Sequence, residues 1–291
     1  MNFDHTDDRR MLVDSLNRYI SKRYTFETRD KIVKSELGYS PEHWQQFAEM
    51  GVIGALFDET VGGYGGGGFD LSVVFEALGR GLVVEPFLAT VLAGSAVAHA
   101  GNDAQGVLLD EIIAGTSIVA LAHSEADGGY TINHAHTIAK RNGDGWLIDG
   151  AKAAVQYGAQ ADYLIVSART GGNDDDHDGI SLFIVPQKTP GITLHAYPNI
   201  DGGAAAELIL NAVSLPATAL LGASGAGYAT LEHSIGRGVL ALCAEAVGAM
   251  DIAKQATLEY LQTREQFGVP IGSFQALQHR MADLLVEIEQ A

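Results

Sequence analysis

The stretch YLQTREQFGVPIGSFQ, residues 260–275, joins two segments whose apolar residues recur at helical spacing. The pattern before it is long, and its apolar positions are Leu231, Ile235, Val239, Leu242, Ala246, Met250 and Ala253. Gly268-Val269-Pro270 must end that helix, because glycine and proline both disfavour helical backbone. We expect Ser273 to cap a second helix that continues to Ala291. The last part of the chain is therefore predicted to be a pair of helices.

Residues 1–115 are predicted to form an all-helical domain. One amphipathic helix is indicated by apolar residues at intervals of three and four, namely Met11, Leu12, Leu16, Tyr19 and Ile20. Ser40-Pro41-Glu42 is typical of a helix start, with serine as the N-cap and proline at the first helical position. Further helices are expected over residues 71–81 and 88–100, the second ending at Gly101.

Residues 116–222 change to short β-branched and aliphatic runs separated by turn residues, which predicts an antiparallel β domain. Asn142-Gly143-Asp144-Gly145 is a strong hairpin signal, because asparagine and glycine tolerate positive φ. The expected strands are residues 117–122, 137–140, 145–148, 163–167, 180–185, 192–195 and 207–210. With a C-terminal helical domain over residues 223–291, the predicted fold class is α+β.

Two loops resemble ligand-binding loops in composition. Residues 62–68 are rich in glycine, but no Lys-Ser/Thr pair follows and no strand-to-helix dinucleotide fingerprint surrounds them, so a flexible turn is favoured over a phosphate cradle. Residues 171–178 carry acidic side chains around His177, and we interpret them as a solvated loop rather than a metal site. No metal is predicted.

Eighteen basic against 36 acidic side chains give a formal net charge of −18. Such a charge repels phosphate backbones, so nucleic acid is not expected as a partner, although a few local arginines can still hold a phosphate-bearing cofactor. The single cysteine, Cys243, lies in an apolar run and is predicted to be a small buried residue. With no disulfide, no signal peptide and no apolar run of membrane-spanning length, we expect a cytoplasmic protein.

The order helical, β, helical, together with the 260–275 stretch, closely resembles the acyl-CoA dehydrogenase family. Residues 59–65 resemble its N-terminal Gly-rich loop, and Gly150-Ala151-Lys152 with Ala161-Asp162 resembles a strand pair of its middle domain. Residues 244–250 and 274–280 look especially like the small (beta) subunits of heteromeric members, such as the pimeloyl-CoA dehydrogenase small-subunit type. The resemblance implies FAD, an acyl-CoA thioester substrate, and α,β-dehydrogenation in which a carboxylate removes the α proton and flavin accepts the β hydride.

The resemblance also implies cofactor contacts in the C-terminal part. Arg264 matches the arginine that reaches the FAD pyrophosphate of a neighbouring subunit, where its planar guanidinium pairs with two oxygens. Phe267 and Gln275 match residues that line the same cofactor. For Phe267, packing in the core is an equally weighted alternative, because apolar side chains are usually buried.

In the middle domain the resemblance implies a second set of contacts. The backbone of His123 and the hydroxyl of Ser124 would face the isoalloxazine, and Gly129 and Tyr130 fall near the expected path of CoA. Where the family commonly has an aromatic ring against the flavin and a threonine bonding N5, residues 154–156 read Ala-Val-Gln. This segment offers no stacking surface, but the Gln156 amide can still hydrogen-bond N5.

No catalytic residue can be assigned. Family members place the catalytic glutamate either in a segment beyond Ala291 or just before the arginine matching Arg237, and the second position here is Gly236. Glu232 lies one helical turn earlier but is more readily interpreted as a surface residue. Arg237 is a candidate for acyl-CoA binding, with pairing to a nearby acid as the alternative.

Three interpretations follow. The chain can be an enzyme subunit that binds FAD and acyl-CoA at an interface and takes its catalytic base from a partner chain. It can be a non-catalytic assembly subunit in which residues 154–156 no longer hold flavin. It can also be a fragment truncated relative to the family. A homo- or hetero-oligomer is expected in the first two cases, because an uncovered helix pair exposes apolar surface, and electron-transfer flavoprotein is a candidate electron acceptor.

Overall fold

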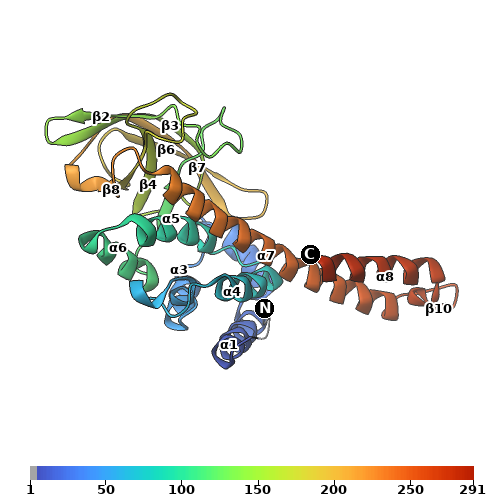
Figure 1. Ribbon diagram of the computed structural model, residues 1–291. Helices are drawn as coiled ribbons and strands as arrows, with labels where there is room; N and C mark the ends of the chain where they lie inside the picture. Colours follow the sequence, from blue (N-terminus) through green and yellow to red (C-terminus); the bar gives the residue numbers. More distant parts are fainter. Residues whose placement is uncertain (1–4) are drawn as a thin grey trace.

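The computed structural model describes residues 5–291, and Figure 1 shows a helical part, a curled sheet and a projecting pair of helices. The α+β fold class predicted from the sequence is confirmed. The first part contains α1 (Asp7–Arg23), α2 (Phe26–Val33), α3 (Pro41–Glu49), the 3-10 turns η1 (Gly54–Leu56) and η2 (Glu59–Val61), α4 (Gly68–Gly81), α5 (Phe87–Ala100) and α6 (Asp103–Ile113).

Capping residues set the ends of these helices as predicted. The Ser40 side chain accepts a hydrogen bond from the His43 N–H at the start of α3, with Pro41 at the first position, and Gly101 follows the end of α5. Helices α2 and α6 were not predicted. Helix α6 begins with a reciprocal pair of hydrogen bonds between Asn102 and Gln105, so a capping box in the sequence marks its start.

The second part is an eight-stranded sheet ordered β6-β7-β3-β2-β4-β5-β8, with β1 pairing β4 off this path. All seven predicted strands are present, and Gly143 takes the positive φ of the predicted hairpin turn. The strands are β1 (Val119–Ala122), β2 (Ile138–Asn142), β3 (Gly145–Gln156), β4 (Tyr163–Arg169), β5 (Ile180–Pro186), β6 (Ile192–Pro198), β7 (Ala204–Leu215) and β8 (Leu220–Leu221). Most neighbouring strands pair antiparallel as predicted, but β1 runs parallel to β4 and Ile138 of β2 also pairs in parallel with Arg169 of β4, so the sheet is mixed.

Alternate residues of the central strands enter two different cores. On β4, Leu164 and Val166 pack inside the curled sheet, whereas Ile165 packs against the helices. The same alternation on β5 sends Phe183 inside the sheet and Leu182 toward the helices. The sheet is therefore fixed to the helical part by one face of these strands.

The third part is α7 (Tyr228–Thr263), a tight connection, and α8 (Gln275–Gln290), which folds back along the end of α7. The connection contains β9 (Glu265–Gln266), β10 (Val269–Pro270) and η4 (Ile271–Ser273). Ser273 does not cap α8 as predicted. Its hydroxyl donates to the Pro270 carbonyl instead, because η4 places Phe274 at the N-cap position.

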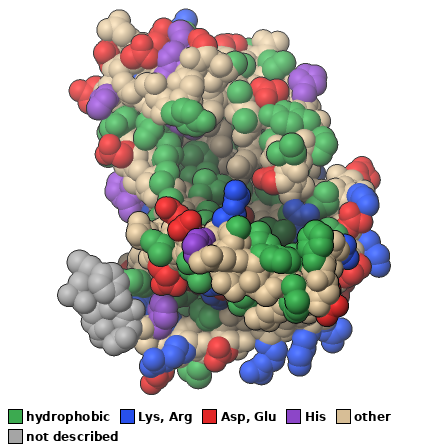
Figure 2. All heavy atoms as spheres, turned by 90° about the vertical axis from the view of Figure 1, so that its right-hand side faces the viewer, with side chains coloured by type: hydrophobic (Ala, Val, Ile, Leu, Met, Phe, Trp, Pro, Cys, Tyr) green, Lys and Arg blue, Asp and Glu red, His purple; other side chains and the backbone are tan. Residues whose placement is uncertain are grey.

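Apolar side chains remain on the surface of α7 and α8. Figure 2 looks onto this side of the molecule and shows hydrophobic side chains across the middle of the face. The exposed apolar residues of α7 and α8 include Val239, Leu242, Ile252, Leu258, Leu284, Leu285 and Val286. Cys243 is also exposed, so its predicted burial is wrong: it lies on a side of α7 that no other described element covers. Among the described residues, no helix combines the length and apolar composition needed to cross a membrane.

One carboxyl group is buried in the helical part without full hydrogen bonding. Glu85 is 4% exposed; its Oε1 accepts from the Ser40 N–H and its Oε2 has no partner among the described residues. Burial raises the pKa of Glu85 from 4.5 to about 7, although hydrogen bonds with Tyr24 and nearby backbone oppose the shift. Between pH 4.5 and about 7, Glu85 therefore keeps its proton in the folded state but releases it in the unfolded chain.

The pH dependence of stability should reflect this group. Because the folded-state pKa of Glu85 is raised, the contribution of its protonated carboxyl group to stability is fully present below pH 4.5. That contribution is lost as the pH rises to about 7. We expect Glu85→Gln to be more stable than the parent by about 3 kcal/mol at pH 8 and by less than about 1 kcal/mol at pH 5. Urea unfolding at both pH values measures this, with the exposed Glu42→Gln as the control. A gain of equal size at both pH values would contradict the assignment.

Candidate functional site

A cavity of about 360 Å³ lies where the three parts of the molecule meet. Helix α5 contributes Leu88 and Leu92, and the segment that follows β1 forms a second wall. Helix α7 closes the third side with Ile235, Gly238, Val239 and Leu242. The walls are mainly apolar, with polar groups supplied by the sheet.

Five of the residues predicted from the sequence line this one cavity: His123, Ser124, Gly129, Tyr130 and Gln156. His123 is buried, whereas the Ser124 and Tyr130 side chains are exposed to solvent. Gly129 takes a φ of +55° within the turn between Ser124 and Tyr130. Sequence reasoning missed the leucine and valine positions of α5 and α7, because their spacing indicates only a buried helix face.

A register irregularity in β3 brings Gln156 to the cavity. The pairing of β3 with β7 shifts between Lys152 and Val155, and Ala154 takes a φ of +52° with its side chain exposed. Such a bulge changes the direction in which the following side chains point. The Ala153 N–H donates to the Ser124 carbonyl at 2.8 Å, so this edge of β3 is tied to the end of β1.

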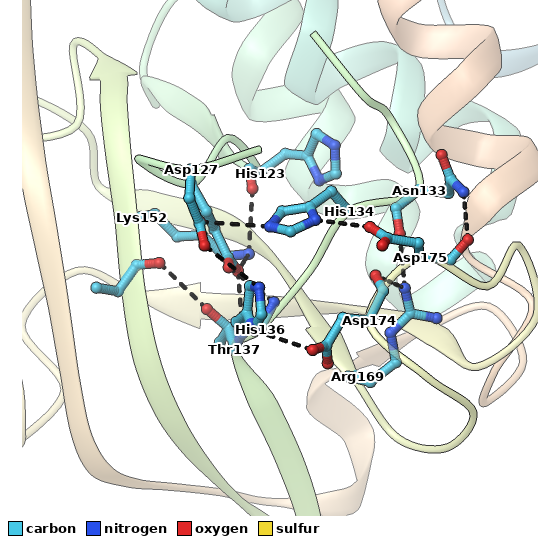
Figure 3. A network of polar contacts seen from close by, with 12 residues as sticks. His123, Asp127, Asn133, His134, His136, Thr137, Lys152, Arg169, Asp174 and Asp175 are labelled. Carbon is cyan, nitrogen blue, oxygen red and sulfur yellow. Dashed lines mark hydrogen bonds and ion pairs between the residues drawn. The ribbon is translucent and has the colours of Figure 1, made fainter. Parts of the chain in front are cut away.

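A buried ionic network lies beneath the cavity wall (Figure 3). The Lys152 ammonium donates to Glu125 at 2.7 Å, to the Ser167 hydroxyl at 3.0 Å and to the His123 carbonyl at 3.1 Å. The Glu125 carboxylate also accepts from the N–H groups of His136 and Thr137. Sequence reasoning missed this network, because the strands bring together residues that are 15 to 29 positions apart.

The network fixes the protonation of its members. Burial alone would raise the pKa of Glu125, but the Lys152 ammonium and two backbone N–H groups lower it to about 2. Burial, followed by the charge of Lys152, lowers the pKa of His123 to about 4, so its imidazole is neutral at pH 7. One ring nitrogen of His123 lies 2.9 Å from the Ser167 hydroxyl and the ring also bonds the Ile132 backbone. His123 is therefore held as part of the wall.

Arg237 is not among the residues that line the cavity, and it forms no ion pair with an acid of residues 5–291. Its guanidinium donates to the Ser95 hydroxyl at 2.9 Å and to the carbonyls of Gly66 and Leu56 at 2.8 and 2.6 Å. The contacts with Ser95 and Leu56 join α7 to α5 and η1, and the contact with Gly66 joins α7 to the Gly-rich segment of residues 62–68. That segment is a turn as predicted, but it is closely packed rather than flexible, since a Cβ on Gly63 would lie 2.0 Å from the Phe57 carbonyl oxygen.

Arg264 and Phe267 lie in the connection between α7 and α8, Gln275 is the first residue of α8, and none of the three lines the cavity. Arg264 follows the cavity residue Leu242 by 22 positions along one helix, which corresponds to about 30 Å. Phe267 is 93% exposed, so its alternative assignment to the core of this chain is wrong. Its ring lies edge-on to Phe274, with centroids 6.2 Å apart. One chain does not bring the two predicted sets of site residues together.

The described residues that line the cavity include a single carboxylate, Glu125, which is fully engaged by Lys152 and two backbone N–H groups. Gly236 has open space where a side chain would begin. Glu232 is exposed and accepts from the Tyr228 hydroxyl at 3.2 Å. The cavity can therefore hold a largely apolar group with a polar edge, but its described lining offers no free carboxylate.

Models of three acyl-CoA dehydrogenase domains match the chain: the N-terminal domain over residues 6–116, the middle domain over 120–213 and the C-terminal domain over 225–291. The probable acyl-CoA dehydrogenase YngJ of Bacillus subtilis is 30% identical over 298 residues, an alignment that covers 100% of this chain and 78% of that protein.

Solved structures share the architecture. The three-dimensional structure of butyryl-CoA dehydrogenase from Megasphaera elsdenii superposes with a TM-score of 0.90 at 27% identity, covering 100% of this chain and 78% of that one. A structure described as the FAD complex of PigA gives a TM-score of 0.91 at 25% identity, covering 100% and 77% of the two chains.

Proposed function

The chain belongs to the acyl-CoA dehydrogenase family, and on this premise we propose that it is a subunit of an FAD-dependent enzyme that oxidises an acyl-CoA thioester between its α and β carbons. Its three domains would span residues 1–115, 116–222 and 223–291. The observation that carries the proposal is the cavity where these parts meet, since it is lined by His123, Ser124 and Gln156.

The separation of the two residue sets supports an interface site. Arg264 follows the end of α7, about 30 Å along that helix from the cavity, and Phe267 and Gln275 come after it, so none of the three lines the cavity of its own chain. A neighbouring chain that packs on the exposed apolar faces of α7 and α8 would bring its own copies of these residues, or their equivalents, to this cavity.

The residues present fit a flavin. Leu88, Leu92 and Val239 give the cavity apolar walls, and Ser124 and Gln156 offer hydrogen-bonding groups at its edge. When bound, the flavin supplies the acceptor for the substrate hydride. Ser124 and Gln156 would orient its ring, and the exposed guanidinium of Arg264 from a neighbouring chain would hold the pyrophosphate.

The acyl-CoA would enter past Gly129 and Tyr130, which form the open rim of the same cavity. A partner chain would supply the base that removes the α proton, because Glu125, the carboxylate in the described lining, is held by Lys152. Electron-transfer flavoprotein would accept the electrons. With these assignments, a complete catalytic site needs this chain and a partner chain that carries the base.

Flavin binding tests the proposal directly. We expect the purified oligomer to carry bound FAD, seen as a visible absorbance band. We expect Arg264→Ala to weaken FAD binding by about thirtyfold, because a charge-assisted hydrogen bond contributes about 2 kcal/mol. The exposed Arg18→Ala is the matched control and should bind FAD as the parent does. Equal affinity in Arg264→Ala and the parent would refute the role of Arg264.

Mixing two defective variants tests the interface. The Gln156→Ala chain keeps an intact Arg264, and the Arg264→Ala chain keeps an intact cavity. In a mixed oligomer, some interfaces combine the intact cavity of one chain with the intact Arg264 of the other. A fraction of the sites should therefore bind FAD with parent-like affinity. Titration of FAD into co-refolded mixtures measures that fraction. If mixtures behave as the average of the two variants, the site is built within one chain.

A non-catalytic assembly subunit is the second candidate. Ala154 supports it, because this exposed residue at the bulge of β3 offers no ring to stack on a flavin. A colourless oligomer that retains no absorbance band after FAD is added and the unbound FAD is removed would favour this function. α,β-Dehydrogenation by the chain together with its partner would exclude it.

A further inference from the structure

Two histidines converge on one aspartate at the surface of the sheet domain, in the segment that also forms part of the cavity wall (Figure 3). His134 Nε2 lies 3.3 Å from one carboxylate oxygen of Asp127, and His136 Nε2 lies 3.3 Å from the other. The two imidazole rings are 4.5 Å apart between centroids. Asp127, His134 and His136 each offer one ligand atom, and these atoms all lie within 4.8 Å of one another.

The opposite nitrogen of each ring is held by a second carboxylate. His134 Nδ1 lies 2.7 Å from Asp175 and His136 Nδ1 lies 3.1 Å from Asp174. A carboxylate that accepts the Nδ1 proton leaves the Nε2 lone pair free, and this pairing orients the histidine ligands of many metal sites. In that tautomer each Nε2 lone pair faces the Asp127 carboxylate, and a cation can take the position that a proton occupies when the ring is protonated.

The distances fit this interpretation. A charge-assisted hydrogen bond is about 2.7–2.9 Å long, so the 3.3 Å separations around Asp127 are long for direct pairing. Ligand atoms bound to a tetrahedral zinc ion at about 2.0–2.1 Å lie roughly 3.3 Å apart. Each histidine lies at this separation from a different oxygen of Asp127, and the three ligand atoms lie within 4.8 Å of one another. Imidazole nitrogen and carboxylate oxygen are also donors that zinc accepts.

Arg169 holds the two loops of this cluster in place. Its buried guanidinium donates to the Asn133 carbonyl and to the Asp174 carbonyl, each at 2.6 Å. The Ala135 N–H donates to the same Asp174 carbonyl at 3.0 Å. The segment carrying the histidines and the acidic loop of residues 171–178 are therefore joined before any ligand binds.

We propose that Asp127, His134 and His136 bind a divalent transition-metal ion of the zinc type, with Asp174 and Asp175 orienting the two histidines. Three protein ligands leave a coordination position for water, since the Asp127 and His136 side chains are 67% and 49% exposed. His134 also lines the cavity, so the bound ion would stabilise the part of the cavity wall formed by residues 128–132. This assignment departs from the sequence-based prediction of no metal.

Titration of zinc chloride into the chelator-treated full-length chain tests the site. Calorimetry should show one ion bound with micromolar or tighter affinity. His134→Gln and His136→Gln should each weaken binding by at least a hundredfold, and Asp175→Asn by about tenfold, because loss of an orienting carboxylate typically costs 10–100-fold. His195→Gln, which removes an exposed histidine on β6, is the matched control and should bind as the parent does.

X-ray absorption at the zinc edge provides a readout that does not depend on any variant. It should show nitrogen and oxygen ligands at about 2.0–2.1 Å with scattering from imidazole rings. Millimolar calcium should not compete, because it prefers oxygen ligands. Absence of binding, competition by calcium, a zinc shell without imidazole, or unchanged affinity in both histidine variants would each overturn the proposal.

Discussion

Lys152→Met is expected to destabilise the protein by about 3–5 kcal/mol at pH 7, because it leaves the Glu125 carboxylate buried without its counter-ion. The Lys152 side chain is fully buried and that of Glu125 is 6% exposed. Ser167 and the His123 carbonyl would lose the same donor. The free energy of unfolding in urea measures the loss.

Two further variants distinguish destabilisation caused by loss of the ion pair from destabilisation caused by loss of packing. Lys140→Met removes an exposed lysine from β2 and should change stability by less than about 0.5 kcal/mol. The double variant Lys152→Met with Glu125→Gln should be more stable than Lys152→Met alone, because it removes the unpaired charge. If the double variant is the less stable of the two, the destabilisation comes from lost packing.

The pH dependence follows from the same pair. The pKa of Glu125 is lowered from 4.5 to about 2, so its contribution to stability is present above pH 4.5 and is lost as the pH falls toward 2. In Lys152→Met the carboxyl can protonate at mildly acidic pH. The difference in the free energy of unfolding between the parent and Lys152→Met should therefore be smaller at pH 4 than at pH 7.

Local sequence patterns predicted most of the fold. The strands β1 to β7 and the helices α1, α3, α4, α5, α7 and α8 follow from periodicity, caps and turn residues. Helix α2 was missed because only Ile32 of its eight residues is buried, so it has little apolar periodicity. The parallel pairing of β1 with β4 was missed because periodicity within a strand does not specify the direction of its neighbour.

The site could be predicted only where a local motif marks it. Residues near the end of β1 and at the end of β3 were identified by resemblance, and five of them line one cavity. The network around Lys152 and the cluster around His134 join residues from separate loops and strands. The His-x-His pattern at residues 134–136 is the one local signal of that cluster, and its carboxylates come from positions 7 to 41 residues away.

Gly248→Ala is expected to destabilise the protein by about 3 kcal/mol, because α7 and α4 approach each other at the backbone. A Cβ on Gly248 would lie 2.0 Å from the Glu76 carbonyl oxygen, and a Cβ on Gly79 of α4 would lie 2.0 Å from the Glu245 carbonyl oxygen. The two glycines thus form a reciprocal contact between the helices. Backbone cannot move aside as a flexible side chain can, so overpacking here must separate α7 from α4.

Gly236→Ala is the matched control on the same helix. No atom of the described residues lies within 4 Å of the position that a Cβ on Gly236 would take. Alanine there should raise stability by roughly 0.4–1 kcal/mol, because it reduces the freedom of the unfolded chain. Opposite signs for the two substitutions in urea unfolding would show that contact with α4, rather than helix propensity, sets the requirement for glycine at position 248. A stabilising Gly248→Ala would mean that the helices lie farther apart, and since α7 also forms the third wall of the cavity, that the cavity is wider.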